Sequence, residues 1–385
     1  MSVLVLGFAL VAVACGDDDA GSNTTSDTAT GASTVAADPP DSDDDADREG
    51  FEPSASDDPQ PTPDDQADQA HQAEASEPGQ VDTASVTEEV TVVDAFGEVT
   101  LTPTATGVYA LDDVAGLVLL ALGVEPLVVE QYFRDQVAGM VLEAAGATIT
   151  PTGSVEAVAA ADPELIVSVS HPGILATREQ YEGITTVVTP EVGDDWSDLL
   201  RVFGAVTGTD DRAEVIIELI QARIDGLRTE LEAAGFGGAV ATVIQPFGSA
   251  FFAYGPGTLP GNLLEELGFT RTEVQSNTTD DNFGFIPVSG ELLAQEADVD
   301  VVFAVGAGEG GGIDSILDHP TVEIGDTPSS VVLEAWYQSH PLTAWMILDD
   351  VESTIFGAGT ATTTADLVEL WDELLAEIDA ASAER

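Results

Sequence analysis

The chain contains no lysine and few basic residues of any kind. Its 385 residues include 71 acidic side chains against 9 basic ones, all of them Arg, for a formal net charge of −62 at pH 7. The lack of Lys excludes a Walker A phosphate loop, a Schiff-base enzyme and a Ser-Lys hydrolase. The negative charge disfavours nucleic acid and anionic lipid as partners, because both are polyanions. We interpret the acidity as solvation of the protein surface, with dissolved salt screening the self-repulsion.

Cysteine occurs once, at Cys15, so the chain cannot form an internal disulfide. The apolar run in residues 1–14 has the length of a signal peptide and is too short to cross a bilayer as a helix, which takes ~20 residues. Its last residues, Ala12 to Ala14, resemble a bacterial lipobox, although Ala12 stands where Leu is usual and no basic residue precedes the run. The resemblance implies that Cys15 is lipidated and becomes the mature N-terminus.

Large apolar side chains are almost absent from residues 15–85, where Phe51 interrupts a run of Asp, Ser, Thr, Ala, Pro and Gln. Such a composition cannot bury enough apolar surface to offset the entropy of ordering, so we predict a disordered acidic linker. A flexible segment of ~70 residues has an r.m.s. span of roughly 45 Å, and like charges extend it further.

The remaining sequence shows two sets of alternating strand and helix patterns with one long helix between them. We assign residues 86–209 to an N-terminal lobe, 210–235 to the connecting helix and 236–385 to a C-terminal lobe. The connecting helix is amphipathic and ~36 Å long at 1.5 Å per residue, with Asp210 or Asp211 as its expected cap and Gly235 as its end. The alternation predicts an α/β fold with parallel sheets covered by helices.

Local signals refine the N-terminal lobe. A hairpin pattern with its turn at Phe96 and Gly97 comes first, and Asp112 is expected to cap a helix that stops at Gly123. We interpret residues 171–181, which follow a buried strand pattern, as a loop.

Four segments of the body resemble those of a known family: LLALGVEPLVV, SVEAVAAADPELIV, GNLLEELGF and SGELLAQEADVDVVF. Their order and spacing are similar to the substrate-binding proteins of ABC importers for ferric siderophores, cobalamin and haem. The resemblance covers Val90 to about Ala380, with one departure at Glu164, where the family usually has Asp. It implies two Rossmann-like lobes joined by a single long helix, with a ligand in the cleft between them. It also implies no catalysis, no cofactor, a monomer, and an ABC permease with its ATPase as partners.

The sequence places a glutamate in the same local setting twice. Ser154 precedes Glu156 and Ser289 precedes Glu291, each at the start of a short helical pattern. The helix dipole favours an acid in the first turn, so both can be explained as dipole compensation. The family resemblance implies a second role, since a Glu on each lobe meets Arg clusters on the two permease subunits. Glu156 and Glu291 are the matching positions.

Ligand contacts are expected in loops after the strands, because a binding crevice lies at the carboxyl ends of parallel strands. A ferric siderophore is bulky and carries its own oxygen donors, so its site needs aromatic walls and an Arg or Tyr donor rather than metal ligands. Arg134 is the strongest single candidate and Arg178 the second. The predicted ligand-binding residues are Tyr132, Phe133, Arg134, His171, Phe252, Tyr254, Trp336 and Tyr337.

Other functions have weaker support. Direct metal capture would depend on His171, His319 and His340, which form no close pair in sequence, and the last two precede Pro in what we interpret as turns. The glycine-rich residues 306–312 lack the following helix of a dinucleotide site and predict a flexible loop. We therefore predict a lipid-anchored, extracytoplasmic binding protein that captures a ferric siderophore. Cobalamin or haem as the ligand, and a surface lipoprotein without a transport role, stay open.

Overall fold

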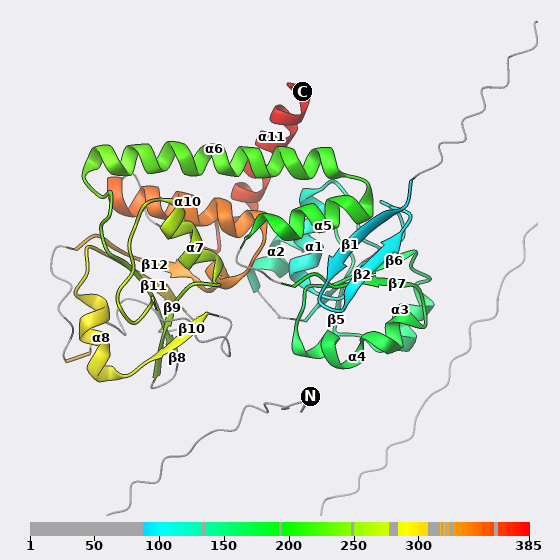
Figure 1. Ribbon diagram of the computed structural model, residues 1–385, viewed down its shortest axis with the longest axis horizontal. Helices are drawn as coiled ribbons and strands as arrows, with labels where there is room; N and C mark the ends of the chain where they lie inside the picture. The colour runs from blue at the N-terminus through cyan, green and yellow to red at the C-terminus, as the bar shows by residue number, and fades with distance from the viewer. Residues whose placement is uncertain are drawn as a thin grey trace, which may run out of the picture. The chain divides into compact units, whose positions relative to one another are not determined.

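The computed structural model describes residues 88–132, 136–191, 195–247, 250–276, 284–306, 316, 319–320, 322, 327–357 and 361–385, and the structural statements below refer to these residues (Figure 1). The predicted signal peptide, Cys15, the predicted linker, Phe133 and Arg134 lie outside them. The chain divides into two units, and every described residue belongs to the second, Val81–Arg385. Within the described part, no helix combines the length and apolar character that crossing a bilayer requires.

A five-stranded, wholly parallel sheet forms the centre of the first lobe, in the order β5–β4–β3–β6–β7. Parallel neighbours need crossover connections, and helices supply them here. The strands are β3 (Val108–Ala110), β4 (Val128–Gln131), β5 (Ile149–Pro151), β6 (Leu165–Val167) and β7 (Thr186–Val188). The helices are α1 (Asp113–Ala121), α2 (Gln136–Ala144), α3 (Val155–Ala160), α4 (Pro172–Glu182) and α5 (Ser197–Thr207).

A β-hairpin precedes this sheet, as the sequence predicts. Strands β1 (Val90–Asp94) and β2 (Gly97–Leu101) pair antiparallel, and Gly97 takes a φ of +124° directly after the turn. In the turn, the backbone N–H of Ala95 donates to the carbonyl of Thr189, the residue directly after the edge strand β7, at 3.0 Å.

The second lobe contains a mixed sheet in the order β10–β9–β8–β11–β12. Strands β8, β11 and β12 are parallel, whereas β9 and β10 run antiparallel to their neighbours, so the prediction of parallel sheets holds for only part of this lobe. Its strands are β8 (Ala241–Phe247), β9 (Ala250–Tyr254), β10 (Phe285–Val288), β11 (Val301–Gly306) and β12 (Ser329–Leu333). Its helical elements are α7 (Leu259–Glu266), α8 (Gly290–Ala297), the 3-10 turn η1 (Glu334–Tyr337) and α10 (Pro341–Phe356).

Two helices begin at His-Pro pairs, where the sequence predicts a loop and a turn. Residues 171–181, predicted as a loop, supply the N-cap and nearly all of α4, and His340, predicted in a turn, precedes the 16-residue α10. In each case the histidine is the N-cap, and its Nδ1 accepts the backbone N–H three residues on, at 3.3 Å for His171 and 3.2 Å for His340. The prolines occupy the first helical position, where no N–H is needed. Both predictions are wrong because histidine is not among the usual N-cap residues.

A single long helix, α6 (Asp210–Ala234), connects the two lobes. Its apolar face is buried and packs against α5 of the first lobe and against α7 and α10 of the second (Figure 1). Gly235 ends it in the left-handed conformation, at φ +93°, as predicted, whereas its N-cap is Thr209 rather than Asp210 or Asp211. The last helix, α11 (Leu367–Ala383), packs on α6 and α10 and also on α2 of the first lobe.

Candidate functional site

Asp112 organises the carboxyl ends of the central strands in the first lobe. The residue is completely buried and caps α1, with Oδ1 accepting the N–H of Ala115 at 2.7 Å, as the sequence predicts for the cap. Its other oxygen, Oδ2, accepts the hydroxyl of Ser168 and the N–H of Val169, both at 2.8 Å. The carboxylate therefore joins the start of α1 to the end of β6. Burial raises the pKa of Asp112 to about 7, although these hydrogen bonds oppose the shift.

His171 continues this arrangement towards the predicted ligand side of the lobe. Its Nε2 lies 3.4 Å from Ser168 Oγ, and its ring stacks on Tyr132, with centroids 3.6 Å apart. Gly173 permits the stack, since a Cβ at that position would lie 2.7 Å from a ring carbon of Tyr132. The structure therefore brings together two predicted site residues, Tyr132 and His171, from the ends of β4 and β6.

The imidazole of His171 is neutral and has both nitrogens engaged. Burial alone lowers its pKa to about 4, because desolvation disfavours the charged form. Since Nδ1 accepts from Ile174 N, the ring proton of the neutral form is on Nε2, which faces Ser168. A histidine held in this way is poorly placed to ligate a metal ion. Among the described residues, no group of three or more His, Cys, Asp or Glu is arranged to hold one.

Two predicted ligand residues of the second lobe lie in its core instead. Tyr254 has no exposed surface and donates its hydroxyl to Gln245 Oε1 at 3.0 Å. Trp336 is equally buried, and its indole N–H donates to Asp350 Oδ2 at 2.7 Å. Neither side chain can contact a ligand in this conformation, which corrects the expectation that both face the cleft. Position after a strand end does not reveal which way a side chain points.

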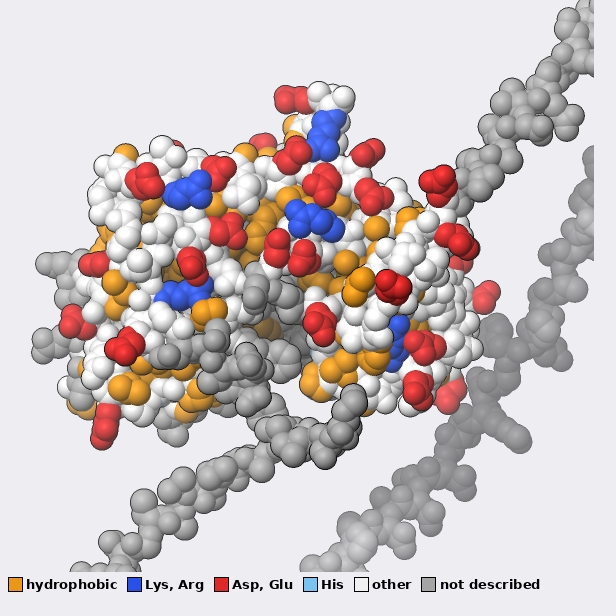
Figure 2. Space-filling view, viewed as in Figure 1, with side chains coloured by type: hydrophobic (Ala, Val, Ile, Leu, Met, Phe, Trp, Pro, Cys, Tyr) orange, Lys and Arg blue, Asp and Glu red, His pale blue; other side chains and the backbone are white. Residues whose placement is uncertain are grey.

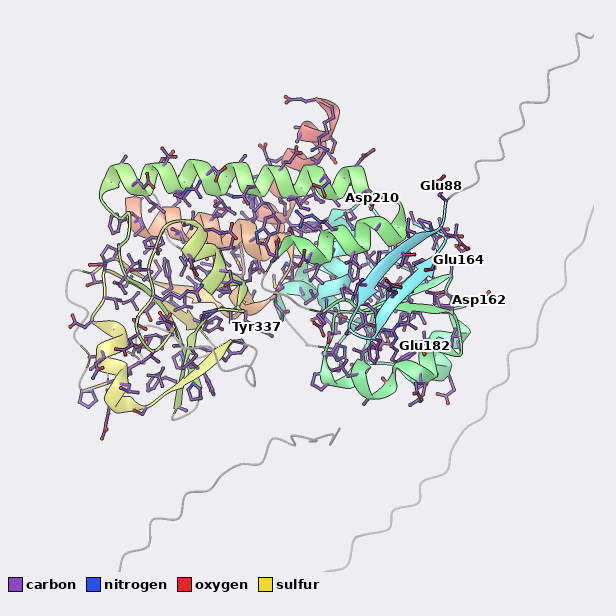
Figure 3. All side chains as sticks on the ribbon, in the orientation of Figure 1. Glu88, Asp162, Glu164, Glu182, Asp210 and Tyr337 are labelled. Carbon is purple, nitrogen blue, oxygen red and sulfur yellow. The ribbon has the colours of Figure 1, made fainter. Side chains whose placement is uncertain are left out.

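Phe252 and Tyr337 are the second-lobe candidates that retain exposed surface. Both are half-buried, Phe252 on β9 and Tyr337 at the end of η1, directly after the carboxyl end of β12. Figure 3 shows Tyr337 on the side of the second lobe that faces the first. Tyr132, His171, Phe252 and Tyr337 thus remain as candidate ligand contacts.

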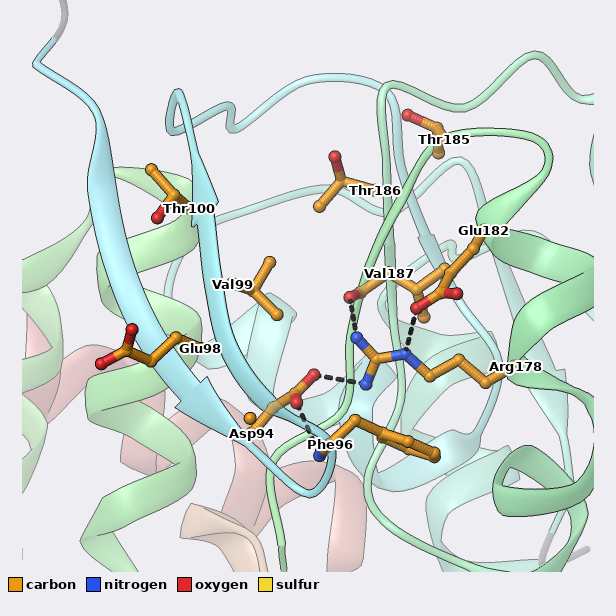
Figure 4. A pocket seen from close by; sticks show the side chains of 11 residues that line it. Asp94, Phe96, Glu98, Val99, Thr100, Arg178, Glu182, Thr185, Thr186 and Val187 are labelled. Atoms are coloured by element: carbon orange, nitrogen blue, oxygen red, sulfur yellow. Dashed lines mark hydrogen bonds and ion pairs between the residues drawn. The ribbon is translucent and has the colours of Figure 1, made fainter.

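A pocket of about 460 Å³ lies in the first lobe between the β1–β2 hairpin, α4 and β7, away from these candidates (Figure 4). At its base Arg178 pairs with Asp94 at 2.5 Å and with Glu182 at 2.8 Å, and it donates to Val187 O at 3.0 Å. Its guanidinium also lies 4.2 Å from the centre of the Phe96 ring. Arg178 therefore links the hairpin to the edge of the sheet through buried ion pairs, and its role as the second ligand cation stays a prediction.

Every Arg that the structure describes pairs with at least one carboxylate. Figure 2 shows the few basic side chains of one face lying beside acidic ones. Several of them fasten α6: Arg212 bonds to Asp379 on α11 and to Ala121 O on α1, and Arg223 pairs with Asp349 on α10. The described Arg residues are Arg178, Arg201, Arg212, Arg223, Arg228, Arg271 and Arg385.

Glu156 and Glu291 occupy equivalent places in the two lobes. Each is exposed in the first turn of its helix, α3 or α8. Ser154 caps α3 through Ala157 N at 3.3 Å, and Ser289 caps α8 through Leu292 N at 3.4 Å. A hydrogen bond from the Ser154 hydroxyl holds the pKa of Glu156 below its usual value. The predicted serine caps are confirmed, and both acids are available to a partner.

Two α/β lobes joined by one long helix define the class of two-lobed binding proteins. Residues 104–324 match the family described as Periplasmic binding protein, and this match spans more than half of the chain. The chain belongs to the periplasmic binding protein family. Its members are solute-binding proteins of ABC transporters that act outside the cytoplasm. A search of curated protein sequences finds no match.

Solved structures share the fold. SirA of Staphylococcus aureus complexed with staphyloferrin B superposes with a TM-score of 0.58 at 16% identity, covering 69% of this chain and 98% of that one. The FhuD protein from S. pseudintermedius gives 0.60 at 14% identity, with 71% and 100% covered. FhuD2 from Staphylococcus aureus with bound ferrioxamine B gives 0.54 at 18% identity, with 65% and 98% covered. At these identities the likeness is one of fold.

Proposed function

We propose that this chain captures a ferric siderophore between its two lobes and delivers it to an ABC permease. The fold carries the proposal, since similar two-lobed structures hold staphyloferrin B and ferrioxamine B. The chemistry of the first lobe agrees with a preformed chelate. His171 is neutral with both nitrogens engaged, and it supports the aromatic ring of Tyr132. Aromatic surface with a few polar groups suits the organic shell of a chelate better than a bare ion.

A ligand panel tests this function. The full chain is titrated with ferrioxamine B, ferric staphyloferrin B, cobalamin, haem and Zn²⁺, and binding is followed by isothermal calorimetry. We expect saturable one-to-one binding of at least one ferric siderophore. Binding of cobalamin or haem alone would show that the chain uses the same fold to bind a different class of ligand. Binding of Zn²⁺ alone would contradict capture of a chelate.

Glu156 and Glu291 are the proposed contacts with the permease, one on each lobe. Both are exposed and lie in the first turn of a helix capped by a serine. Charges of this kind orient an encounter and accelerate it more than they strengthen the complex.

A lipid on Cys15 is the proposed anchor on the outer face of the membrane, with residues 15–85 as the tether. The expected outcome for Cys15→Ser is release of the protein from the membrane fraction into the medium or periplasm. An unchanged membrane fraction would contradict the anchor without touching the ligand assignment.

A further inference from the structure

A continuous line of contacts runs from the buried start of α1 to the ring of Tyr132. Asp112 Oδ2 lies 2.8 Å from Ser168 Oγ, Ser168 Oγ lies 3.4 Å from His171 Nε2, and the His171 ring lies 3.6 Å from the Tyr132 ring. Asp112 and Ser168 have no exposed surface, and His171 is 6% exposed. The line therefore leads from the core to the half-buried Tyr132 at the end of β4.

The donors and acceptors along this line have one consistent order. Asp112 accepts from Ala115 N and Val169 N, so the ionised carboxylate acts as an acceptor towards Ser168 as well. The single hydroxyl hydrogen of Ser168 goes to Asp112 at 2.8 Å rather than to Val169 O at 3.0 Å. Ser168 Oγ then has a lone pair directed to the Nε2–H of His171. The other nitrogen, Nδ1, accepts from Ile174 N, so the ring is fixed at both ends.

We propose that Asp112 and Ser168 are positioning residues that hold His171 as a fixed platform under Tyr132, and so set the aromatic wall that the first lobe presents to a metal chelate. The inference rests on the proposed function for the identity of the ligand. The fixed tautomer and the stack belong to the ligand-free protein and do not depend on that identity. In this arrangement His171 affects ligand binding by supporting the Tyr132 ring. Its two ring nitrogens contact Ser168 and Ile174 within the protein.

Nitrogen NMR tests the positioning directly. The chain has four histidines, so uniform [¹⁵N]histidine labelling of the full chain gives four imidazoles, and a His171→Asn sample assigns one of them. At pH 8, above the pKa of about 7 for Asp112, we expect His171 as the Nε2–H tautomer alone. His340, whose Nδ1 also caps a helix, provides the internal standard. In Ser168→Ala we expect the His171 Nε2 signal to shift because Nε2–H loses its hydrogen-bond acceptor, while Ile174 N still holds the tautomer and the His340 signals stay unchanged. Unaltered His171 signals in that variant would overturn the proposal.

Ligand affinity supplies the second readout. The variants are Ser168→Ala, His171→Asn, which keeps a good N-cap but removes the ring, and the control Ser170→Ala, two residues on and partly exposed. We expect affinity for ferrioxamine B, or for whichever ferric siderophore the wild type binds, to fall about three- to tenfold in the first two and not in the control. Unchanged affinity in both variants would overturn the proposal. His171→Asn keeps the test decisive where Ser168→Ala fails to fold. If the wild type binds no ferric chelate, the proposed function fails, and the NMR result still decides the positioning.

Discussion

Glu156 and Glu291 are each the second residue of a short helix, each two positions after a serine whose side chain caps that helix. The two helices, α3 and α8, belong to different lobes, and each leads into a buried parallel strand, β6 or β11. The repeated helix-then-strand order follows from two similar α/β lobes. In our proposal, the exposed glutamate at this position of each lobe contacts the permease.

Replacing either glutamate is expected to separate transport from binding. Glu156→Ala and Glu291→Ala should each lower the rate of siderophore uptake about tenfold, because the permease loses one of two orienting charges, while the affinity for the ligand is unchanged. Uptake by cells and calorimetry on the purified variants measure the two quantities. Glu369→Ala is the matched control, since Glu369 is also an exposed acid in the first turn of a helix. Equal uptake by wild type, both variants and control would contradict the docking role.

The buried ion pair between Arg178 and Asp94 predicts a large loss of stability when one partner is removed. Their side chains are 6% and 0% exposed, so Arg178→Ala leaves an uncompensated buried carboxylate and should cost about 3–5 kcal/mol in the free energy of unfolding. Arg201→Ala is the control, because Arg201 is 46% exposed and its carboxylates lie at 3.5–3.6 Å, which predicts a loss under about 1 kcal/mol. Urea denaturation measures the free energy of unfolding of both variants. Comparable losses of stability would contradict a stabilising role for the buried Arg178–Asp94 pair.

A methyl group at residue 173 should disturb the stack at the candidate site. In Gly173→Ala the new Cβ would meet the Tyr132 ring at 2.7 Å, so we expect the ring to move and ligand affinity to fall. Gly226 in α6 has nothing within 4 Å of such a Cβ, and Gly226→Ala should raise stability by about 0.5–1 kcal/mol with unchanged affinity. Calorimetric titration of both variants checks this. Normal affinity in Gly173→Ala would mean that Tyr132 does not contact the ligand.

The buried cap His340 should make stability depend on pH. Burial lowers its pKa from 6.5 in the unfolded chain to about 3 in the folded protein, so the unfolded state binds more protons between these values. Stability from this residue is therefore fully present above pH 6.5 and is lost as the pH falls towards 3. His340→Asn keeps a capping side chain without a titratable ring. The wild type should lose more stability than this variant between pH 7 and pH 4.5 in urea denaturation. If the free energies of unfolding of the wild type and His340→Asn change equally with pH, the lowered pKa of His340 is contradicted.

The sequence predicted the features that depend on periodicity and on common helix signals. The lobe–helix–lobe order, the cap at Asp112, the end of α6 at Gly235 and both serine caps are confirmed. Helix α4, which is predicted as a loop, and α10, whose His340-Pro start is predicted as a turn, are missed because His-Pro is an uncommon helix beginning. Glu164, which departs from the family pattern, accepts hydrogen bonds from Thr104 at 2.8 Å and Thr106 at 3.3 Å, a link across about 60 residues that no local pattern reveals.

The candidate site was harder to predict, because its members are defined by direction and by long-range contacts. Tyr132 and His171 follow strand ends and do come together, whereas Tyr254 and Trp336 follow the same rule and point into the core. Arg178 stands out in so acidic a chain, yet its partner Asp94 is 84 residues away in sequence. Ser168 carried no signal, since a serine at the end of a buried strand is common and its contact with Asp112 is visible only in three dimensions.

Equilibrium dialysis with radioactive iron tests whether the chain captures a ferric siderophore. The full chain is dialysed against ⁵⁵Fe-labelled ferrioxamine B and against ferric staphyloferrin B, with iron-free siderophore and ⁵⁵Fe citrate in parallel. Capture of a ferric siderophore predicts one saturable site for at least one of the labelled chelates, and weaker binding of the iron-free form and of iron citrate. Retention of iron from citrate with no retention of either chelate would contradict capture of a ferric siderophore.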